Sequence, residues 1–329
     1  MNCPQPKNTK DVVRPEHCAL AVAVPTTQEE LEKDIHSSIH EFARQQVVGG
    51  FIFDGVVKQA WANHYGSILE ELASVVDQVG QLGVTVVKQA KLSDLAELLK
   101  RFRAVTVLAH SLFRTLGASD ILDREMILND MRSANSRNPT DPRHVLISKL
   151  QADPQLRNAD SIQEFIKALN YRLEQTKEYY YNRGANGVAT DLESAGPRVG
   201  WTPVLFYDAF PDAVKPPLVI EMRDGFHNFE ELVAAVPSTF TGTIDFLTCS
   251  ALAFCEPLRR RRPNCGDILC PKQPARIPER LALYQNAVRL LAKENTGYSD
   301  AMLAIHAMAV RWVQQSVATT RPKQKLQPA

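Results

Sequence analysis

One segment constrains the fold of this chain more than any other. It contains an apolar, β-branched run (GVTVVKQA, residues 83–90), a helical pattern (LSDLAELLKRFR, 92–103) and a second apolar run (AVTVLAH, 104–110). A strand, a helix and a strand at this spacing predict a βαβ unit, in which a right-handed crossover joins two parallel strands. The chain is therefore expected to fold as a three-layer α/β domain, with a mostly parallel sheet flanked by helices.

The strand pattern returns later in the chain. Two runs, PPLVIEM (216–222) and TIDFLTC (243–249), predict further strands, and a short helical pattern separates them. Between about residues 111 and 216 the chain is polar, helical and rich in turn residues, so we interpret this block as a helical insertion. Two amphipathic patterns then predict a helical C-terminal section at about 278–318.

The limits of the domain follow from composition. Hydrophobic residues make up 44% of the chain, enough for a sizeable core. Residues 1–17 are polar and are predicted to form a disordered leader, residues 18–318 the folded domain, and residues 319–329 a frayed tail. No run is long enough to span a bilayer, and the leader has no apolar signal-peptide core. These features predict a cytoplasmic protein with reduced thiols.

The balance of charged residues limits which partners the chain could attract by its net charge. The chain has 38 basic and 37 acidic residues, so its net charge of +1 gives no field that would attract nucleic acid or a membrane. The sequence contains neither a G-x-G-x-x-G motif nor a P-loop, which counts against a nucleotide-binding α/β protein. We therefore expect no membrane partner, no nucleic-acid partner and no organic cofactor.

Two of the predicted strands end in residues able to do proton or nucleophile chemistry. AVTVLAH ends at His110, and TIDFLTC ends at Cys249. If the two strands are parallel in one sheet, these residues lie at the same carboxyl edge, where open α/β sheets build their sites. A thiol and an imidazole brought together there form a nucleophile and its base.

The order of these motifs resembles that of a known family. A strand that ends in His-Ser (AVTVLAHS), a later strand with an Asp-Gly turn (LVIEMRDG), a helix, and a strand that ends in Cys-Ser (TIDFLTCS) resemble the caspase-like cysteine peptidases. Within them the CHAT group, relatives of caspases and separase, is the most similar. The resemblance covers about residues 83–114 and 217–262, under a third of the chain.

The resemblance implies a caspase-like fold and a cysteine endopeptidase. Cys249 would be the nucleophile and His110 the general base or acid, while backbone N–H groups of Ser111 and Cys249 would hold the oxyanion. Such bacterial proteins often cleave one chosen protein partner in antiphage defence or regulated cell death. No metal or other cofactor is implied.

The chain departs from the family pattern in two ways. Glycine usually follows the family's histidine, but Ser111 stands there in this chain. The stretch from His110 to Cys249 is also far longer than the roughly 50 residues of the caspase pattern. A catalytically inactive scaffold or protein-interaction module of the same fold is therefore the alternative.

Two acidic residues near these motifs are further candidates. Asp245 lies four residues before Cys249 on the same predicted strand, so the two side chains share a face. The resemblance implies that Asp245 binds a basic side chain of the substrate, as in relatives that cleave after Arg or Lys. The alternative, which we favour, is a strand carboxylate paired with a nearby arginine. Asp224 is expected to shape its turn.

Three other features have a structural and a functional interpretation. Cys255, Cys265 and Cys270 fit no standard zinc spacing, so we interpret them as ordinary thiols and expect no metal site. The run Arg259–Arg262 is interpreted as a solvent-exposed helix end. The three tyrosines Tyr179–Tyr181 cannot all face one way on a helix, and they indicate either a docking face for a regulatory protein or packing of the insertion on the α/β core.

Overall fold

The computed structural model describes most of the chain. The described residues are 12–36, 66, 68–113, 116–133, 142–185, 206–207, 209–216, 218–248, 251–270 and 277–320.

A five-stranded parallel sheet forms the centre of the molecule, in the order β2-β1-β3-β7-β8. Its strands are β1 (Cys18–Val22), β2 (Thr85–Lys88), β3 (Ala104–Leu108), β7 (Thr243–Phe246) and β8 (Ile268–Leu269). The predicted α/β class with a mostly parallel sheet is confirmed. The predicted βαβ unit is β2–α5–β3, but β1 lies between its two strands and pairs with both.

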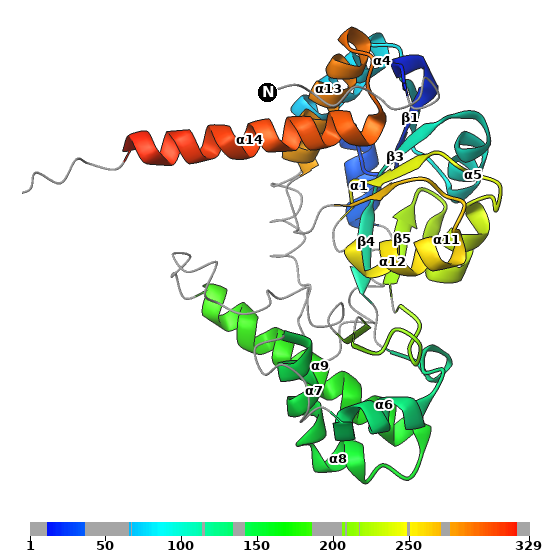
Figure 1. Ribbon diagram of the computed structural model, residues 1–329, viewed down its shortest axis with the longest axis vertical. Coiled ribbons are helices and arrows are strands. Elements are labelled where there is room, and N and C mark those ends of the chain that lie inside the picture. Colours follow the sequence, from blue (N-terminus) through cyan, green and yellow to red (C-terminus); the bar gives the residue numbers. More distant parts are fainter. Residues whose placement is uncertain are drawn as a thin grey trace, which may run out of the picture.

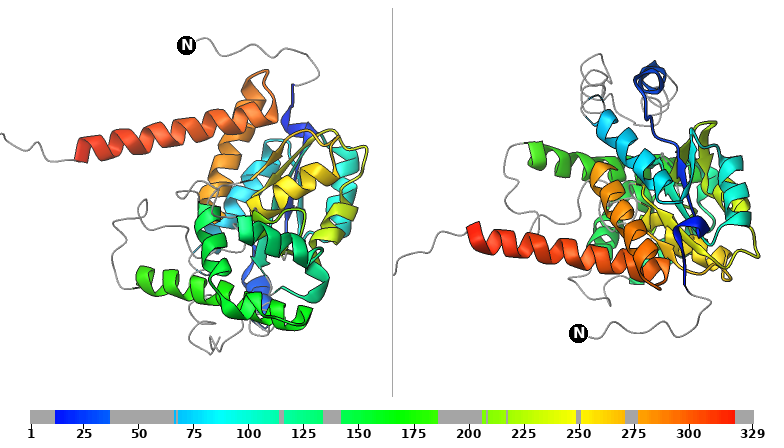
Figure 2. Two further views of the ribbon diagram at one scale, coloured as in Figure 1. Left: turned by 60° about the horizontal axis from the view of Figure 1, so that its bottom comes forward. Right: turned by 90° about the horizontal axis from the view of Figure 1, so that it is seen from above.

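Helices cover both faces of this sheet (Figures 1 and 2). One face is covered by α4 (Leu69–Gln81), α13 (Ile277–Lys293) and the start of α14 (Tyr298–Thr320), and the other by α5 (Leu92–Arg101), α11 (Phe229–Ala235) and α12 (Leu252–Arg261). Strand β1 shows the alternation that produces the two layers. Ala19 and Ala21 belong to the core on the face covered by α5, α11 and α12, whereas Leu20 and Val22 belong to the core on the face covered by α4, α13 and α14.

A second, three-stranded sheet is antiparallel, in the order β4-β5-β6. It consists of β4 (His110–Phe113), β5 (Leu218–Met222) and β6 (Gly225–Asn228). The run AVTVLAH is therefore not one strand: β3 ends at Leu108, and His110 opens a strand of the second sheet. Gly225, at φ +126°, closes the tight turn between β5 and β6, because glycine adopts this conformation without strain.

The turn after β5 is tied to the main body. The Asp224 carboxylate accepts a hydrogen bond from the Leu92 backbone N–H (3.2 Å) and lies 3.0 Å from the His227 ring nitrogen Nε2. Both interactions lower the pKa of Asp224. Arg223 donates its backbone N–H to the Ala90 carbonyl oxygen (3.0 Å). Asp224 thus shapes the turn and anchors the small sheet beside the large one.

The residues between β4 and β5 form a separate helical lobe, at the bottom of Figure 1. Its helices are α6 (Arg124–Arg132), α7 (Pro142–Gln151), α8 (Pro154–Arg157) and α9 (Ile162–Ala185). They share a core of their own, which includes Ile127, Met131, Ile147, Leu156, Phe165, Leu169, Phe206 and Phe210. The chain enters this lobe after Phe113 and returns at Leu218, and these two residues are paired across β4 and β5. The segment that forms the lobe therefore leaves the small sheet and returns to it at the same paired position.

The N-terminal boundary differs from the one predicted. Residues 12–17 pack on the domain and are not a disordered leader: Val13 is buried, and its backbone N–H donates to the Thr296 carbonyl oxygen (3.1 Å). Val13 belongs to the same core as α13 and α14, which explains why this polar segment is ordered. Residues 1–11 and 321–329 lie outside the described residues.

Candidate active site

In the sequence, two of the predicted site residues follow the carboxyl ends of the central strands β3 and β7. β3 and β7 are parallel neighbours, and Val107 pairs with Phe246. The Leu247 N–H donates to the Val107 carbonyl oxygen (2.9 Å), which continues the ladder past the end of β7. His110 is the third residue after Val107, and Cys249 is the third residue after Phe246. Cys249 and Ser250 themselves lie outside the described residues.

His110 is held by the backbone at the junction of the two sheets. It follows β3 with only Ala109 between them, and it is the first residue of β4. Its side chain is partly buried, and desolvation lowers the pKa of the imidazole to about 4. At neutral pH this imidazole is uncharged, so it is able to accept a proton.

Glu221 lies directly across from His110 in the antiparallel ladder. Residues in such positions have Cβ atoms about 4.5–5.5 Å apart and side chains on the same face. Glu221 is partly buried. The run PPLVIEM predicted a strand, but its antiparallel pairing with the four residues HSLF, and therefore this neighbour of His110, was not predicted.

Ser111 fits an ordinary strand conformation. It pairs with Ile220 in β4 and is buried. Among the described residues, Gln89 is the only one other than glycine with a positive φ angle, so the backbone of Ser111 lies in a region open to any residue. The position after His110 therefore does not require a glycine for conformational reasons.

Asp245 lies in the interior and not at an open surface. Only 2% of the residue is exposed, and its carboxylate accepts a hydrogen bond from the Tyr298 hydroxyl (2.7 Å) of α14. The same hydroxyl lies 2.8 Å from the Thr106 hydroxyl of β3. Desolvation raises the pKa of Asp245 to about 6, against the opposing effects of Tyr298 and of the Arg280 charge. The prediction that Asp245 binds substrate is therefore not supported, and the alternative, a strand carboxylate near an arginine, fits the structure.

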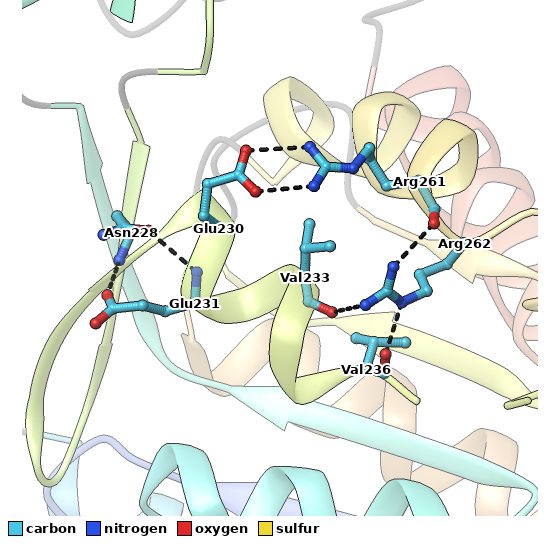
Figure 3. Close-up of polar contacts among 7 residues, drawn as sticks. All are labelled: Asn228, Glu230, Glu231, Val233, Val236, Arg261 and Arg262. Carbon is cyan, nitrogen blue, oxygen red and sulfur yellow. Dashed lines mark hydrogen bonds and ion pairs between the residues drawn. The ribbon is translucent and has the colours of Figure 1, made fainter. Parts of the chain in front are cut away.

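The arginine run fixes α12, the helix that follows Cys249. Figure 3 shows Arg261 making two hydrogen bonds to Glu230 of α11, at 2.9 and 3.1 Å. Arg262 donates to the carbonyl oxygens of Val236 (2.7 Å) and Val233 (2.6 Å) at the end of α11, and the Val233 oxygen also accepts the Val236 backbone N–H (3.2 Å). The run is thus not simply a solvated helix end, because it binds α12 to α11.

The two other arginines of the run also have partners. Arg259 donates to the Ile268 carbonyl oxygen of β8, and Arg260 lies 3.6 Å from Asp212 at the edge of the helical lobe. None of these contacts was predicted from the sequence, because each depends on how α12 packs against another element and not on a local pattern. The only signal was the presence of four adjacent arginines.

The described residues contain neither a candidate metal site nor a helix that could cross a membrane. Within them, no group of three or more His, Cys, Asp and Glu side chains is arranged to hold a metal ion. In the same part of the chain, none of the helices has the length and apolar character needed to cross a bilayer. Tyr179–Tyr181 lie on α9, but their side chains are outside the described set.

Comparison with known proteins adds no relative. No protein-family model matches the chain, and neither a curated protein nor a solved structure matches it. The functional assignment therefore depends on the geometry of this molecule and on the motifs in its sequence.

Proposed function

We propose that this protein is a cysteine endopeptidase that uses Cys249 as the nucleophile and His110 as the general base. One observation carries the proposal: His110 and Cys249 follow adjacent parallel strands, three residues beyond a pair of residues in register. Adjacent strands lie about 4.8 Å apart. Three residues span at most about 10 Å, so this register allows an imidazole and a thiol at these positions to meet, as the proposal requires.

The start of α12 supports the same chemistry. The helix begins at Leu252, three residues after Cys249, and its N-cap is Ala251, which has no side-chain acceptor for the first N–H groups. These N–H groups and the helix dipole favour negative charge near the helix start. In the proposed reaction they stabilise the thiolate of Cys249 and, with backbone N–H groups near Ser111 and Cys249, the oxyanion of the tetrahedral intermediate.

The proposed reaction is acyl transfer followed by hydrolysis. His110 accepts the proton of the Cys249 thiol as the sulfur attacks the carbonyl carbon of the scissile peptide bond, and it then gives this proton to the leaving amine. Water next attacks the thioester, which releases the acid product and restores the thiol. His110 suits the first step because its imidazole is uncharged at neutral pH.

The substrate and the setting are part of the proposal. The order β4, β5, Asp-Gly turn, α11 and β7 is the order of motifs in which the chain resembles CHAT-type caspase relatives. From this resemblance we infer a cytoplasmic enzyme that cleaves one chosen protein partner, in bacterial antiphage defence or regulated cell death. The helical lobe beside His110 offers a separate surface for recognising that partner or a regulatory protein.

The test is a search for cleavage products. Wild-type protein and the Cys249→Ala variant are incubated with a cell extract, and new protein N-termini are labelled and identified by mass spectrometry. The proposal predicts a small set of cleavage sites with the wild type and none with Cys249→Ala or His110→Ala. If a folded wild-type protein produces no cleavage that the variants lack, and no peptide electrophile labels Cys249, the protein is a scaffold of the same fold.

A further inference from the structure

Two cysteine thiols outside the proposed active site are in contact with each other. Cys255 lies on α12, and Cys270 directly follows β8, the edge strand of the main sheet. Their side chains are hydrogen-bonded to each other. Neither residue is part of a disulfide in the structure, and their spacing in the sequence predicted only ordinary thiols.

The scaffold around the pair holds the two thiols in place. Cys255 is 1% exposed and belongs to the core between the sheet and α12, and Cys270 packs against the edge of the same core. The Arg259 side chain, one helical turn beyond Cys255, donates to the Ile268 carbonyl oxygen and so ties α12 to β8. Leu269, the residue before Cys270, pairs with Asp245 of β7.

The two thiols have different chemical characters. Cys255 donates the hydrogen bond and is desolvated, so its pKa is raised. Cys270 accepts that hydrogen bond and lies near the positive charge of Arg259, and its pKa is lowered. Cys270 is also partly exposed. An accessible thiol with thiolate character, next to a second thiol, is the arrangement that redox-sensitive proteins use.

We propose that Cys255 and Cys270 form a reversible disulfide when the protein meets a hydroperoxide. The Cys270 thiolate attacks the peroxide O–O bond, which breaks, and gives a sulfenic acid and water or an alcohol. The Cys255 thiol then attacks the Cys270 sulfur, and the hydroxyl leaves as water with the Cys255 proton. Two thiols are oxidised, one peroxide is reduced, and two thiol equivalents restore the reduced form.

The geometry favours this product. A disulfide needs Cβ atoms about 3.5–4.5 Å apart and sulfurs at about 2.05 Å. Cys255 and Cys270 are close enough to shift each other's pKa, and both pack in the core between α12 and the sheet. The bond would join α12 to the end of β8 and close the loop between them. Because α12 begins just after Cys249, the modification would restrain the neighbourhood of the proposed active site. Its formation does not depend on Cys249 being a nucleophile.

Two other thiols of the chain are suited to serve as controls. Cys265 donates a hydrogen bond to the Gly242 carbonyl oxygen (3.7 Å), and burial raises its pKa to about 11. Cys18 is fully buried in β1, and burial raises its pKa to about 12. Neither has the combination of exposure and lowered pKa that Cys270 has.

The experiment maps the disulfides of the oxidised protein. The Cys249→Ala variant removes the competing thiol of the proposed active site. The protein is treated with a small excess of hydrogen peroxide, its free thiols are blocked, and it is digested without reduction by trypsin and an Asp-specific protease. Cys255, Cys265 and Cys270 then lie on separate peptides. We expect a Cys255–Cys270 linked peptide in most molecules, which a thiol reductant removes.

Two serine variants and the unfolding temperature test whether the disulfide forms between Cys255 and Cys270. In Cys270→Ser the linked peptide should be lost, whereas in Cys265→Ser it should form as in the parent. The oxidised parent should also unfold at a higher temperature than its reduced form, and Cys270→Ser should show no such shift. A folded protein that gives only sulfinic or sulfonic acid at Cys270, or that links Cys265 instead, overturns the proposal. None of these results bears on whether the wild type cleaves proteins.

Discussion

The α/β body and the helical lobe of this molecule are built in different ways. In the body, the core joins residues that are far apart along the chain: Leu20 of β1, Val76 of α4 and Tyr284 of α13 share one cluster. In the lobe, the core comes from one continuous part of the chain, from Leu116 to Val214. The two parts are linked through the paired residues Phe113 and Leu218 of the small sheet.

This difference indicates that the lobe is a separate structural unit attached beside His110. Because Phe113 and Leu218 face each other, the excursion between them leaves the hairpin of β4 and β5 intact. The strands β3 and β7 also stay paired, so the chain places a long helical segment between the two candidate catalytic residues without separating the strands that precede them. It also predicts that stability and recognition can be changed independently in the two parts.

The largest expected effect comes from removing a core side chain in each part. Leu20→Ala should destabilise the body by about 2–5 kcal/mol, and Phe165→Ala should destabilise the lobe by about 3–5 kcal/mol, because each creates a cavity at a fully buried site. Hydrogen exchange followed by mass spectrometry should show faster exchange throughout the body in the first variant. In the second, it should show faster exchange in the lobe alone. Equal loosening of both parts by Phe165→Ala would contradict the separation.

A smaller effect is expected from the polar group that holds α14 on the sheet. Tyr298→Phe removes the hydroxyl shared by Asp245 and Thr106, and it should cost about 1–3 kcal/mol at pH 7.5 because both groups are buried. The pKa of Asp245 is about 6 in the folded protein, raised from its ordinary 3.8. Between these two pH values the folded protein binds more protons than the unfolded chain, so the free energy of unfolding falls as the pH rises.

The loss of stability in Tyr298→Phe should itself depend on pH. The Tyr298 hydrogen bond lowers the pKa of Asp245, so Tyr298→Phe should raise it further and steepen the loss of stability towards neutral pH. Urea unfolding of both proteins at pH 5 and pH 7.5 should show a larger difference at pH 7.5. His110, whose folded pKa is lowered, has the opposite pH trend, but it contributes equally to both proteins. A difference that is independent of pH would argue against a buried, titrating Asp245.

The arginine contacts between α11 and α12 should give graded losses within the body. Arg262→Gln should cost about 1–2 kcal/mol, since two carbonyl oxygens at the end of α11 lose a charged donor. Arg261→Gln breaks an exposed ion pair and should cost only about 0.2–1 kcal/mol. Arg260→Gln, whose contact with Asp212 is long and exposed, is the matched control. Thermal unfolding of the three variants measures the order, and equal losses would contradict it.

The smallest effect on the body is expected from deleting the lobe. Replacing residues 114–217 by a short glycine-containing turn joins Phe113 to Leu218, which are already paired. The body should remain folded with nearly the stability of the full chain, because the buried residues of its cores are distinct from those of the lobe core. Circular dichroism and urea unfolding of the deletion protein test this. If the shortened protein does not fold, the lobe is part of the body.

Much of the body could be predicted from the sequence, and the limits have physical causes. The runs containing β2, β3, β5 and β7 were predicted as strands from their apolar residues, and the parallel pairing followed from the intervening helix. β8 was missed because it is only Ile268–Leu269 at the edge of the sheet. The break at Ala109 was missed because AVTVLAH has the composition of a single strand up to His110, and a change of sheet leaves no local signal in it.

The candidate site was predictable only in part for a similar reason. His110 and Cys249 could be singled out because each ends a local pattern. Glu221, the arginine contacts and the Cys255–Cys270 pair depend on register and on packing between distant segments, which no local pattern encodes. Asp245 was placed on the correct strand, but its burial under Tyr298 depends on α14 and could not be seen from β7 alone.

The most direct test of the central claim is the rate at which a peptide electrophile labels Cys249 as a function of pH. Labelling is quantified by mass spectrometry in the wild type and in His110→Ala. Because burial lowers the pKa of His110 to about 4, the wild type should label quickly from neutral pH down to about pH 5 and lose reactivity only near pH 4. His110→Ala should label more slowly by on the order of 10²–10⁴-fold. Equal rates in the two proteins, or a wild-type profile that rises only near the ordinary thiol pKa of about 8.5, would contradict the account.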